Sequence, residues 1–492
     1  MTGVERLRLD ALPGLPAAQR PQIDPRELGT GIVHLGIGAF HRAHQAVFTE
    51  EAVAAAGGDW GICGVSQRSR GVVDQLRPQD GLYSVLERGE RTSLRVVGAV
   101  RDLLFAAQEG ERLQALLAAP GTRLVTLTVT EKGYRHDPAT GRLRRTDPDV
   151  AADLAGGPPR TVVGQLVRGL QARRAADAGP VTLLSCDNLP SNGAVLRGLV
   201  ADFCAALPAA EGEPLATWIA GSVSFPSSMV DRIVPATTDD DRAEAARLLG
   251  CEDHGVVVTE PFRQWVVEDD FAAGRPAWER AGAVLTADVA PYEAMKLRLL
   301  NGSHSTLAYL GALAGHAHVA DAMADAGIAG VVARLMADDV EPALTVPDGF
   351  DLAAYQRELI ERFHNPALRH RTVQIAMDGT QKLPQRLLGT IADRLAAGAE
   401  PRFACLGVAA WMRYVWTRQT EQGAPLPVDD PLADRLAELT AQAGTPEAAV
   451  DALLTLEEVF GPDLPANERF RTLVTDAVEA LTKGGVAAAT HL

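Results

Sequence analysis

The segment G-I-V-H-L-G-I-G-A-F-H-R-A-H, residues 31–44, joins an apolar run to two closely spaced glycines and then to a helical pattern. Ile32 to Leu35 predicts a buried strand, and the apolar residues that follow recur at helical spacing. This is the context of a dinucleotide-binding fingerprint, in which Gly36 permits the tight turn. Gly38 would let the backbone approach a pyrophosphate at the positive end of the helix. The segment therefore predicts a dinucleotide site, although a purely structural turn carries the same letters.

The sequence departs from the usual fingerprint at two points. His41 stands where the third glycine of G-x-G-x-x-G is expected. The second predicted strand ends in V-S-Q-R, residues 65–68, without the acidic residue that holds the ribose of NAD. Arg68 or Arg70 could face a 2′-phosphate instead. The sequence therefore predicts NAD as the cofactor and leaves NADP open.

His41 and His44 lie three residues apart on one face of the predicted helix, a spacing that can also serve a metal ion. No third ligand follows close by in the sequence. Packing beside the cofactor is the interpretation we favour, so we expect no metal.

Strand and helix patterns alternate along the first part of the chain, which implies a mostly parallel sheet with helices on both faces. Further strands are expected at residues 60–65, 96–100, 123–130, 181–186 and 216–223. Near residues 285–291 the pattern becomes helical. We predict an α/β fold: a Rossmann-type, doubly wound dinucleotide-binding domain at 1–288, followed by a mostly α-helical substrate-binding and catalytic domain at 289–492.

The composition of the chain limits the kinds of molecule that it is expected to bind. The 492 residues carry a formal net charge of −16, which argues against nucleic acid or an anionic membrane. Five cysteines without a C-x-x-C pair indicate reduced thiols. The N-terminus has no apolar signal-peptide core, and no uncharged apolar run reaches the ~18 residues of a membrane helix. We expect a cytoplasmic protein, a monomer or small homo-oligomer, that acts on a small molecule.

A second informative segment is P-Y-E-A-M-K-L-R-L-L-N-G-S-H, residues 291–304. On an α-helix of ~100° per residue, four polar side chains share an arc of about 140°. They are Glu293, Lys296, Asn301 and His304. A polar face on an otherwise apolar helix can line a cleft. The alternative is a solvated face with an ion pair between Glu293 and Lys296.

These residue types suit the oxidation of a secondary alcohol. A partly desolvated lysine has a lowered pKa, so Lys296 could take the hydroxyl proton as a general base. Asn301 could donate a hydrogen bond to the oxygen as charge develops on it. His304 could hold a neighbouring hydroxyl, and Glu293 could relay the proton to water. A nucleotide-binding regulator without catalysis is the competing class, but it has no need of this set.

Several segments between about residue 30 and about residue 470 resemble the polyol-specific long-chain dehydrogenases, the mannitol dehydrogenase family. Besides the glycine turn and the lysine helix, they are T-V-T-E-K-G-Y (128–134), S-C-D-N-L-P-S-N-G (185–193), F-P-S-S-M-V-D-R-I-V-P (225–235) and E-P-F-R-Q-W-V-V-E-D (260–269). The resemblance implies a Rossmann domain, a helical C-terminal domain and catalysis without zinc.

The resemblance also implies roles for matching residues. Lys296 looks like the catalytic base, Asn192 and Asn301 like the amides around the reacting oxygen, and His304 like a histidine that binds substrate. Asp231 looks like a carboxylate on the substrate side, and Glu293 like a glutamate near the proton exit. The implied cofactor contacts are Gly36, Gly38, Phe40, His41, Arg42, Thr130, Glu131 and Asn188.

Within the family, H-R-T-V-Q-I-A-M-D-G-T-Q-K-L-P-Q-R (370–386) is more similar to fructuronate reductases (D-mannonate oxidoreductases) than to mannitol 2-dehydrogenases. Gln374 occupies the place of an arginine that contacts substrate in the mannitol enzymes. Fructuronate carries a carboxylate, which arginine or lysine commonly binds. Arg371 and Lys382 are the candidates, with surface or structural pairing as the alternative. We predict interconversion of D-fructuronate and D-mannonate, with mannitol or another polyol or sugar acid, such as tagaturonate, as the alternative substrate.

Overall fold

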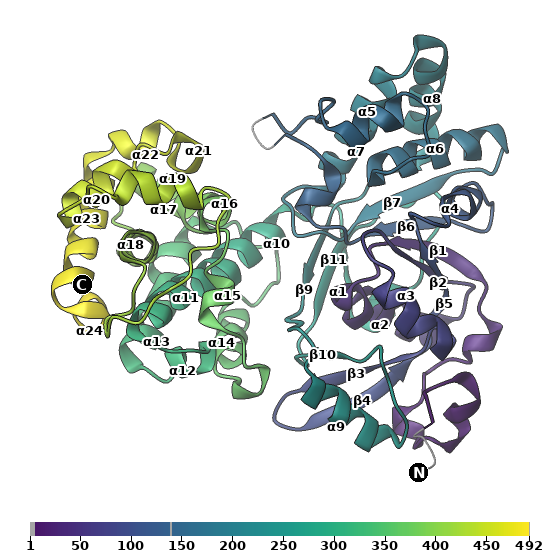
Figure 1. The fold of residues 1–492 in the computed structure, drawn as a ribbon, viewed down its shortest axis with the longest axis horizontal. Coiled ribbons are helices and arrows are strands. Elements are labelled where there is room, and N and C mark those ends of the chain that lie inside the picture. The colour runs from purple at the N-terminus through teal and green to yellow at the C-terminus, as the bar shows by residue number, and fades with distance from the viewer. Residues whose placement is uncertain (1–4, 138–139, 492) are drawn as a thin grey trace. The chain divides into compact units, whose positions relative to one another are not determined.

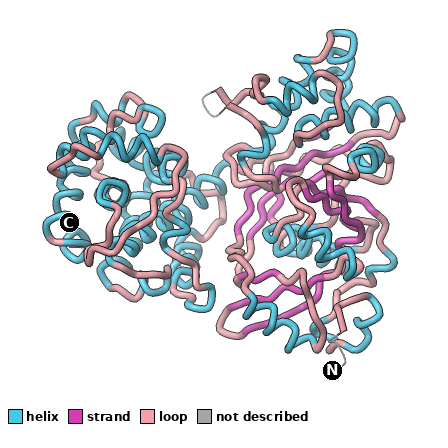
Figure 2. Tube along the Cα trace, viewed as in Figure 1, coloured by secondary structure: helices cyan, strands magenta, loops and turns pink. Residues whose placement is uncertain are grey.

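The structure is a computed structural model that describes residues 5–137 and 140–491. The chain divides into two compact units, Met1–Ala290 and Pro291–Leu492. Figure 2 shows that the strands of the described chain belong to the first unit, whereas the second is built from helices and loops. The predicted fold class is confirmed.

The first unit is organised around a six-stranded sheet in the order β5-β2-β1-β6-β7-β8, in which every neighbouring pair is parallel. From β1 the chain passes to β2 and β5 on one side and returns through β6 to the other (Figure 1). The strand order therefore reverses beside β1, and a ligand of such a sheet binds at the carboxyl ends of the strands there. The strands are β1 (Thr30–Leu35), β2 (Gly61–Ser66), β5 (Val100–Phe105), β6 (Leu124–Leu127), β7 (Val181–Ser185) and β8 (Val223–Ser224).

Both faces of this sheet are buried, because alternate residues of each strand enter different cores. Val33 and Leu35 join a cluster that contains residues of α4 (Gly110–Leu117), α6 (Val162–Ala175) and α7 (Asn192–Ala206). Ile32 joins a second cluster with residues of α2 (Gln45–Ala56) and α3 (Gly71–Leu76). A strand buried on both sides is mostly apolar, and the one polar residue in the middle of β1, His34, is hydrogen-bonded to Thr126 and Thr128.

Two small sheets complete the first unit. One has the order β10-β3-β4 and the other β12-β11-β9. Their strands are β3 (Tyr83–Arg88), β4 (Thr92–Val97), β9 (Ser228–Asp231), β10 (Val257–Thr259), β11 (Gln264–Glu268) and β12 (Val284–Thr286).

Two of the expected strands are wrong. Residues 216–223 lie mostly in α8 (Ala209–Ser222), and β8 begins only at Val223. A short apolar run fits a buried strand and a buried helix equally well, and here the preceding helix formers continue through it. Residues 96–100 span the end of β4 and the start of β5, because the chain turns at Gly98, whose N–H donates to the buried Glu50 carboxylate.

The helical unit has α18 (Arg402–Thr417) at its centre, packed against α11 (Ser303–Ala314) and α23 (Glu468–Lys483) (Figure 1). Most of α18 is buried. Other helices of this unit are α10 (Ala290–Met295), α12 (Val319–Met323), α13 (Ala326–Arg334), α14 (Leu352–Phe363), α15 (Thr372–Ile375), α16 (Gly379–Leu383), α17 (Gly389–Ala396), α19 (Ala433–Thr440), α20 (Pro446–Leu453), α21 (Glu457–Phe460), α22 (Asp463–Ala466) and α24 (Gly485–Ala489). Across the described residues, no helix combines the length and apolarity that crossing a membrane requires.

Candidate active site

The glycine turn lies at the carboxyl end of β1, between β2 and β6. Gly36 has φ +101°, and a Cβ on it would lie 2.1 Å from the carbonyl oxygen of Thr128. Gly38 has φ −80° and caps the short helix α1 (Ala39–Ala43). A Cβ on Gly38 would have the carbonyl oxygen of Gly36 as its nearest neighbour, 3.8 Å away. The space beside Gly38 is what the close approach of a dinucleotide requires, and the binding role of Gly38 stays a prediction.

The loops after β6 and β7 reach the same edge of the sheet and carry three more predicted cofactor residues: Thr130, Glu131 and Asn188. Thr130 has φ +67°, a strained conformation for a β-branched residue. The buried carboxylate of Asp187 accepts hydrogen bonds from the N–H groups of Val129 and Thr130 at 3.1 and 2.8 Å. Burial raises the pKa of Asp187. Asp187 thus holds the strained loop in place.

Sequence reasoning missed Asp187, although it follows directly on β7 in S-C-D-N, residues 185–188. The Tyr134 hydroxyl also donates to this carboxylate, at 2.7 Å. An acidic residue at the carboxyl end of a parallel strand was the available signal. Its partners follow another strand and could not be read from the sequence.

The residues of α1, and His44 directly after it, are engaged in packing. His41 stacks on His34 with ring centroids 3.4 Å apart, and burial lowers the pKa of both imidazoles. His44 is hydrogen-bonded through Nε2 to the carbonyl oxygen of Gln264 at 2.8 Å.

Two neighbours in this helix are packed as well. Phe40 stacks on His44 with ring centroids 5.0 Å apart. Arg42 donates to the carbonyl oxygen of Gly255 and lies over the Tyr83 ring. Within residues 5–137 and 140–491, no group of three or more His, Cys, Asp or Glu side chains is placed to hold a metal ion.

The end of β2 carries arginines rather than an acid. Arg70 is paired with Asp74 at 2.8 Å and donates to Gln108. Arg68 reaches the Thr130 hydroxyl at 3.5 Å. Arg68 therefore points toward the loop after β6, and Arg70 is engaged elsewhere.

Asn192 and Asp231 are the predicted substrate-side residues of the first unit. The Asn192 amide donates to the carbonyl oxygens of Asp187 and Ser228 at 2.9 and 2.8 Å, and its oxygen accepts from the Ser228 N–H at 2.9 Å. The amide hydrogens thus tie the start of α7 to the loop after β7 and to β9. Asp231 ends β9 and is 4% exposed.

The lysine segment of the second unit is not a continuous α-helix. A π-helical stretch, Lys296–Gly302, separates α10 from α11. In a π-helix the backbone bonds run from i to i+5, so residues five apart are about one turn apart and lie near the same face, whereas in an α-helix they diverge by about 140°. Lys296 and Asn301 are five apart. The π-helical stretch therefore brings them onto one face more closely than the sequence predicted.

The four polar residues of this segment are buried: Glu293 is 9%, Lys296 7%, Asn301 8% and His304 9% exposed. Burial of this extent does not fit the solvated face that was the alternative. Among the described residues, Nδ2 of Asn301 and Nε2 of His304 have no hydrogen-bond partner. Buried polar atoms are normally paired, so these two are available to donate hydrogen bonds to a ligand or accept them from it.

Cationic groups surround His304. Its ring stacks on Phe363 and meets His370 edge-on, with centroids 5.3 and 5.1 Å away. Burial, then the charges of His370, Arg386, Arg362 and Lys382, lower the pKa of His304. Burial, followed by the charge of Arg386, lowers the pKa of Lys382 to about 8.

Two further residues of the 370–386 segment that the sequence analysis singled out, Arg371 and Gln374, lie at the surface. Arg371 is exposed and joins His318 in an isolated β-bridge. Gln374 is exposed as well.

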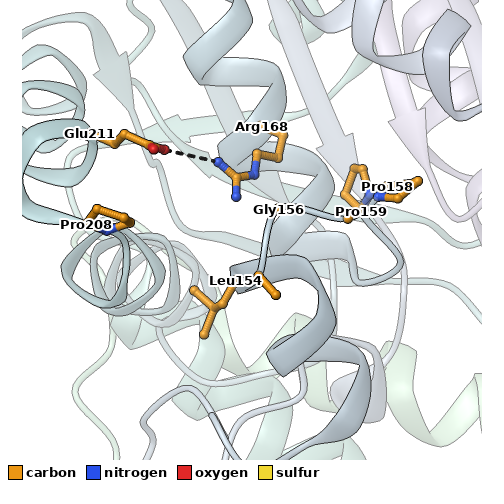
Figure 3. Close-up of a pocket in the computed structure, with 9 residues that line it drawn as sticks. Leu154, Gly156, Pro158, Pro159, Arg168, Pro208 and Glu211 are labelled. Atoms are coloured by element: carbon orange, nitrogen blue, oxygen red, sulfur yellow. Dashed lines mark ion pairs between the residues drawn. The ribbon is translucent and has the colours of Figure 1, made fainter.

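A hollow in the outer part of the first unit contains none of the predicted site residues (Figure 3). It lies between α5 (Pro148–Leu154), α6 and α8, and Arg168 and Glu211 form an ion pair across it at 3.6 Å. The predicted residues instead gather at the carboxyl edge of the sheet in one unit and along the π-helical stretch in the other.

A parallel sheet with this glycine turn is a Rossmann-type domain, and the comparisons with known proteins agree. Residues 30–280 match the Mannitol dehydrogenase Rossmann domain, and residues 288–482 match the Mannitol dehydrogenase C-terminal domain. The chain belongs to the mannitol dehydrogenase family of oxidoreductases. The resemblance inferred from the sequence is thereby confirmed.

Three relatives span nearly the whole chain. The uncharacterized oxidoreductase YeiQ of Escherichia coli (strain K12) is 46% identical, over 94% of this chain and 95% of its own. The D-mannonate oxidoreductase of the same organism is 44% identical, over 96% and 97%. The structure of Pseudomonas fluorescens mannitol 2-dehydrogenase, a ternary complex with NAD and D-mannitol, is 38% identical, covers 99% of each chain and has a TM-score of 0.88.

Proposed function

We propose that this protein is an NAD-dependent oxidoreductase that interconverts D-fructuronate and D-mannonate, with Lys296 as general acid and base and without a catalytic metal. The observation that carries the proposal is the buried face of Lys296, Asn301 and His304 beside a group of cations. Lys296, Asn301 and His304 fit the oxidation of an alcohol, and the cations fit an acidic substrate. A D-mannonate oxidoreductase that is 44% identical over 96% of this chain supports it.

NAD supplies the hydride acceptor when bound. The first unit, with 1–288 as the proposed domain, would bind it at the glycine turn and at the loops after β6 and β7. The proposed contacts are Gly36, Gly38, Phe40, His41, Arg42, Thr130, Glu131 and Asn188. NADP remains an alternative, because arginines and no acid follow β2. The proposed domain 289–492 would bind the sugar.

The chain's own residues handle the proton. In the direction of oxidation, Lys296 accepts the hydroxyl proton, and a buried lysine is suited to this because desolvation favours its neutral form. Nδ2 of Asn301 donates to the oxygen as it becomes a carbonyl, and Nε2 of His304 holds an adjacent hydroxyl. Glu293, one α-helical turn before Lys296, passes the proton to water. In the direction of reduction each step is reversed.

Asn192, Asp231, Arg371 and Lys382 complete the proposed set. Asn192 would have to release a backbone carbonyl before donating to substrate, so its hydrogen bonds suit it to positioning the chain around Asp187 and Ser228. Asp231 would accept from substrate hydroxyls. Lys382 and Arg371 are the proposed partners of the carboxylate. The buried, unpaired cysteines agree with a proposed cytoplasmic location.

The test is a panel of initial rates. The purified protein is given NADH or NADPH with fructuronate, tagaturonate or fructose, and NAD with mannonate or mannitol. We expect the highest kcat/KM for fructuronate and NADH. Activity confined to fructose and mannitol would refute the sugar-acid proposal.

A second candidate is a mannitol 2-dehydrogenase. It is favoured by the likeness to the Pseudomonas fluorescens enzyme, whose complex contains D-mannitol. It predicts oxidation of mannitol with no requirement for a carboxylate. The same panel separates the two, because mannonate and mannitol differ in the group at one end of the chain.

A further inference from the structure

Arg386 approaches the lysine segment from a separate helix. It lies in a second π-helical stretch, Pro384–Leu388, which packs on the first. The approach is close because Gly302 has no side chain: a Cβ there would lie 2.7 Å from the carbonyl oxygen of Arg386. One guanidinium nitrogen, Nη1, donates to the Ser305 hydroxyl at 2.9 Å and to the carbonyl oxygen of Asn301 at 3.4 Å. The guanidinium is therefore held beside Asn301 and His304.

The rest of the Arg386 guanidinium has no hydrogen-bond partner among the residues that the structure describes. Among the described residues, Nε and Nη2 of Arg386 donate to no acceptor, and neither Arg386 nor Lys382 forms an ion pair. Withdrawing a cation from water is costly unless an anion meets it. Burial lowers the pKa of Arg386 to about 10, and the nearby Tyr309 and Asp378 offset only part of that effect. Arg386 keeps a partly exposed side, so a ligand can reach it.

Lys382 and Arg371, the two cations that the sequence predicted for the carboxylate, differ from Arg386 in their surroundings. Lys382 donates to the carbonyl oxygens of Ile375 and Met377 at 3.3 and 2.5 Å, which uses two of its three N–H groups. Arg371 is exposed and lies at the N-terminus of α15. A guanidinium with a free Nε–Nη2 edge offers two parallel N–H donors, the geometry that matches a carboxylate.

We propose that Arg386 binds the carboxylate of the sugar-acid substrate through its Nε–Nη2 edge, with Lys382 as a second cation. The proposal rests on the proposed function and names its specificity-determining residue. It explains how one site could distinguish an acid from a neutral ketose: fructuronate carries a carboxylate where fructose carries a CH2OH. The reacting carbonyl, at another carbon of the sugar, would lie near Nδ2 of Asn301.

The test compares an acid with a neutral ketose on the same variant. For Arg386→Met we measure kcat/KM for fructuronate and for fructose and take their ratio. We expect the ratio to fall about ten- to a hundredfold, the effect of removing a charge-assisted bidentate contact. Arg386→Lys keeps the charge without the fork and should give an intermediate ratio.

Two control variants separate binding from support of the fold. Ser305→Ala removes the hydrogen bond to Nη1 and leaves the guanidinium, so the ratio should stay at the wild-type value. Arg298→Met removes another arginine of the lysine segment, one that pairs with Asp393 at 2.6 Å, and should also leave the ratio unchanged. If Arg386→Met does not fold, Arg386→Lys carries the test alone.

The outcomes distinguish this inference from the proposed function. A wild-type enzyme that reduces fructuronate, together with Arg386 variants that keep the wild-type ratio, would overturn the role of Arg386 only. The same holds if Ser305→Ala lowers the ratio as far as Arg386→Met, because the effect would then be structural. A wild-type enzyme that acts on fructose and on no sugar acid would overturn both.

Discussion

The two glycines after β1 differ in what a methyl group would meet, and this leads to a matched pair of substitutions. In Gly36→Ala the new Cβ would lie 2.1 Å from the carbonyl oxygen of Thr128, on a backbone with φ +101°. Real side chains essentially never come within 3.0 Å of a neighbour, so Thr128 would have to withdraw by about 1 Å. That movement strains the hydrogen bond from the Thr128 N–H to the carbonyl oxygen of Leu35, which is 2.9 Å long.

The expected loss of stability for Gly36→Ala has two parts. An L-residue with positive φ costs about 1–2 kcal/mol. Forcing an extra methyl group into packed surroundings costs about 1–3 kcal/mol more. We therefore expect the free energy of unfolding to fall by about 2–5 kcal/mol.

Gly38→Ala is the control. Gly38 has φ −80°, and its Cβ would have no neighbour closer than 3.8 Å, so stability should change by less than about 1 kcal/mol. The methyl group would occupy the space through which a pyrophosphate approaches, and the Kd of NAD should rise by about tenfold or more.

The assay is urea unfolding of both variants by circular dichroism and tryptophan fluorescence, with NAD titrations on the folded proteins. Equal stability of Gly36→Ala and Gly38→Ala would refute the steric reasoning at Gly36. Unaltered NAD affinity in Gly38→Ala would refute the placement of the pyrophosphate.

Further expectations concern the chemistry and its pH dependence. Lys296→Ala should lower kcat by about 10²–10⁴-fold while the Kd of NAD stays within a factor of about two, because the lysine acts on the proton and not on the dinucleotide. Single-turnover rates measure this effect, and a rate near that of the wild type would contradict the role of Lys296. Lys382 is charged below its pKa of about 8, so KM for a sugar acid should be lowest below pH 8 and rise as the proton is lost above it. If KM depends on pH as strongly in Lys382→Met as in the wild type, this expectation is wrong. Asn192→Ala removes three hydrogen bonds to buried backbone groups and should reduce stability by about 3 kcal/mol in urea unfolding, at about 1 kcal/mol for each bond. Chelator treatment should leave turnover unchanged, and strong inhibition by EDTA would require a metal in the mechanism.

The sequence alone determined the features that depend on neighbours along the chain. An apolar run, a glycine that must adopt positive φ and a helical period together specify β1, the turn at Gly36 and α1. These preferences act within a few residues of one another, so they can be read without knowing the fold. The change from alternating strands and helices to helices alone is a pattern of the same local kind.

Only the tertiary structure decided features that depend on segments far apart in the chain. Residues 216–223 are apolar enough for either a strand or a helix, and packing selected the helix α8. The sequence predicted an α-helix through residues 296–302, whereas the structure has a π-helical stretch there that places Lys296 and Asn301 on one face. Arg386 meets Asn301 across 85 positions of sequence, through the gap left by the missing side chain of Gly302. Such contacts arise from the packing of whole helices, which the local preferences of the sequence do not contain.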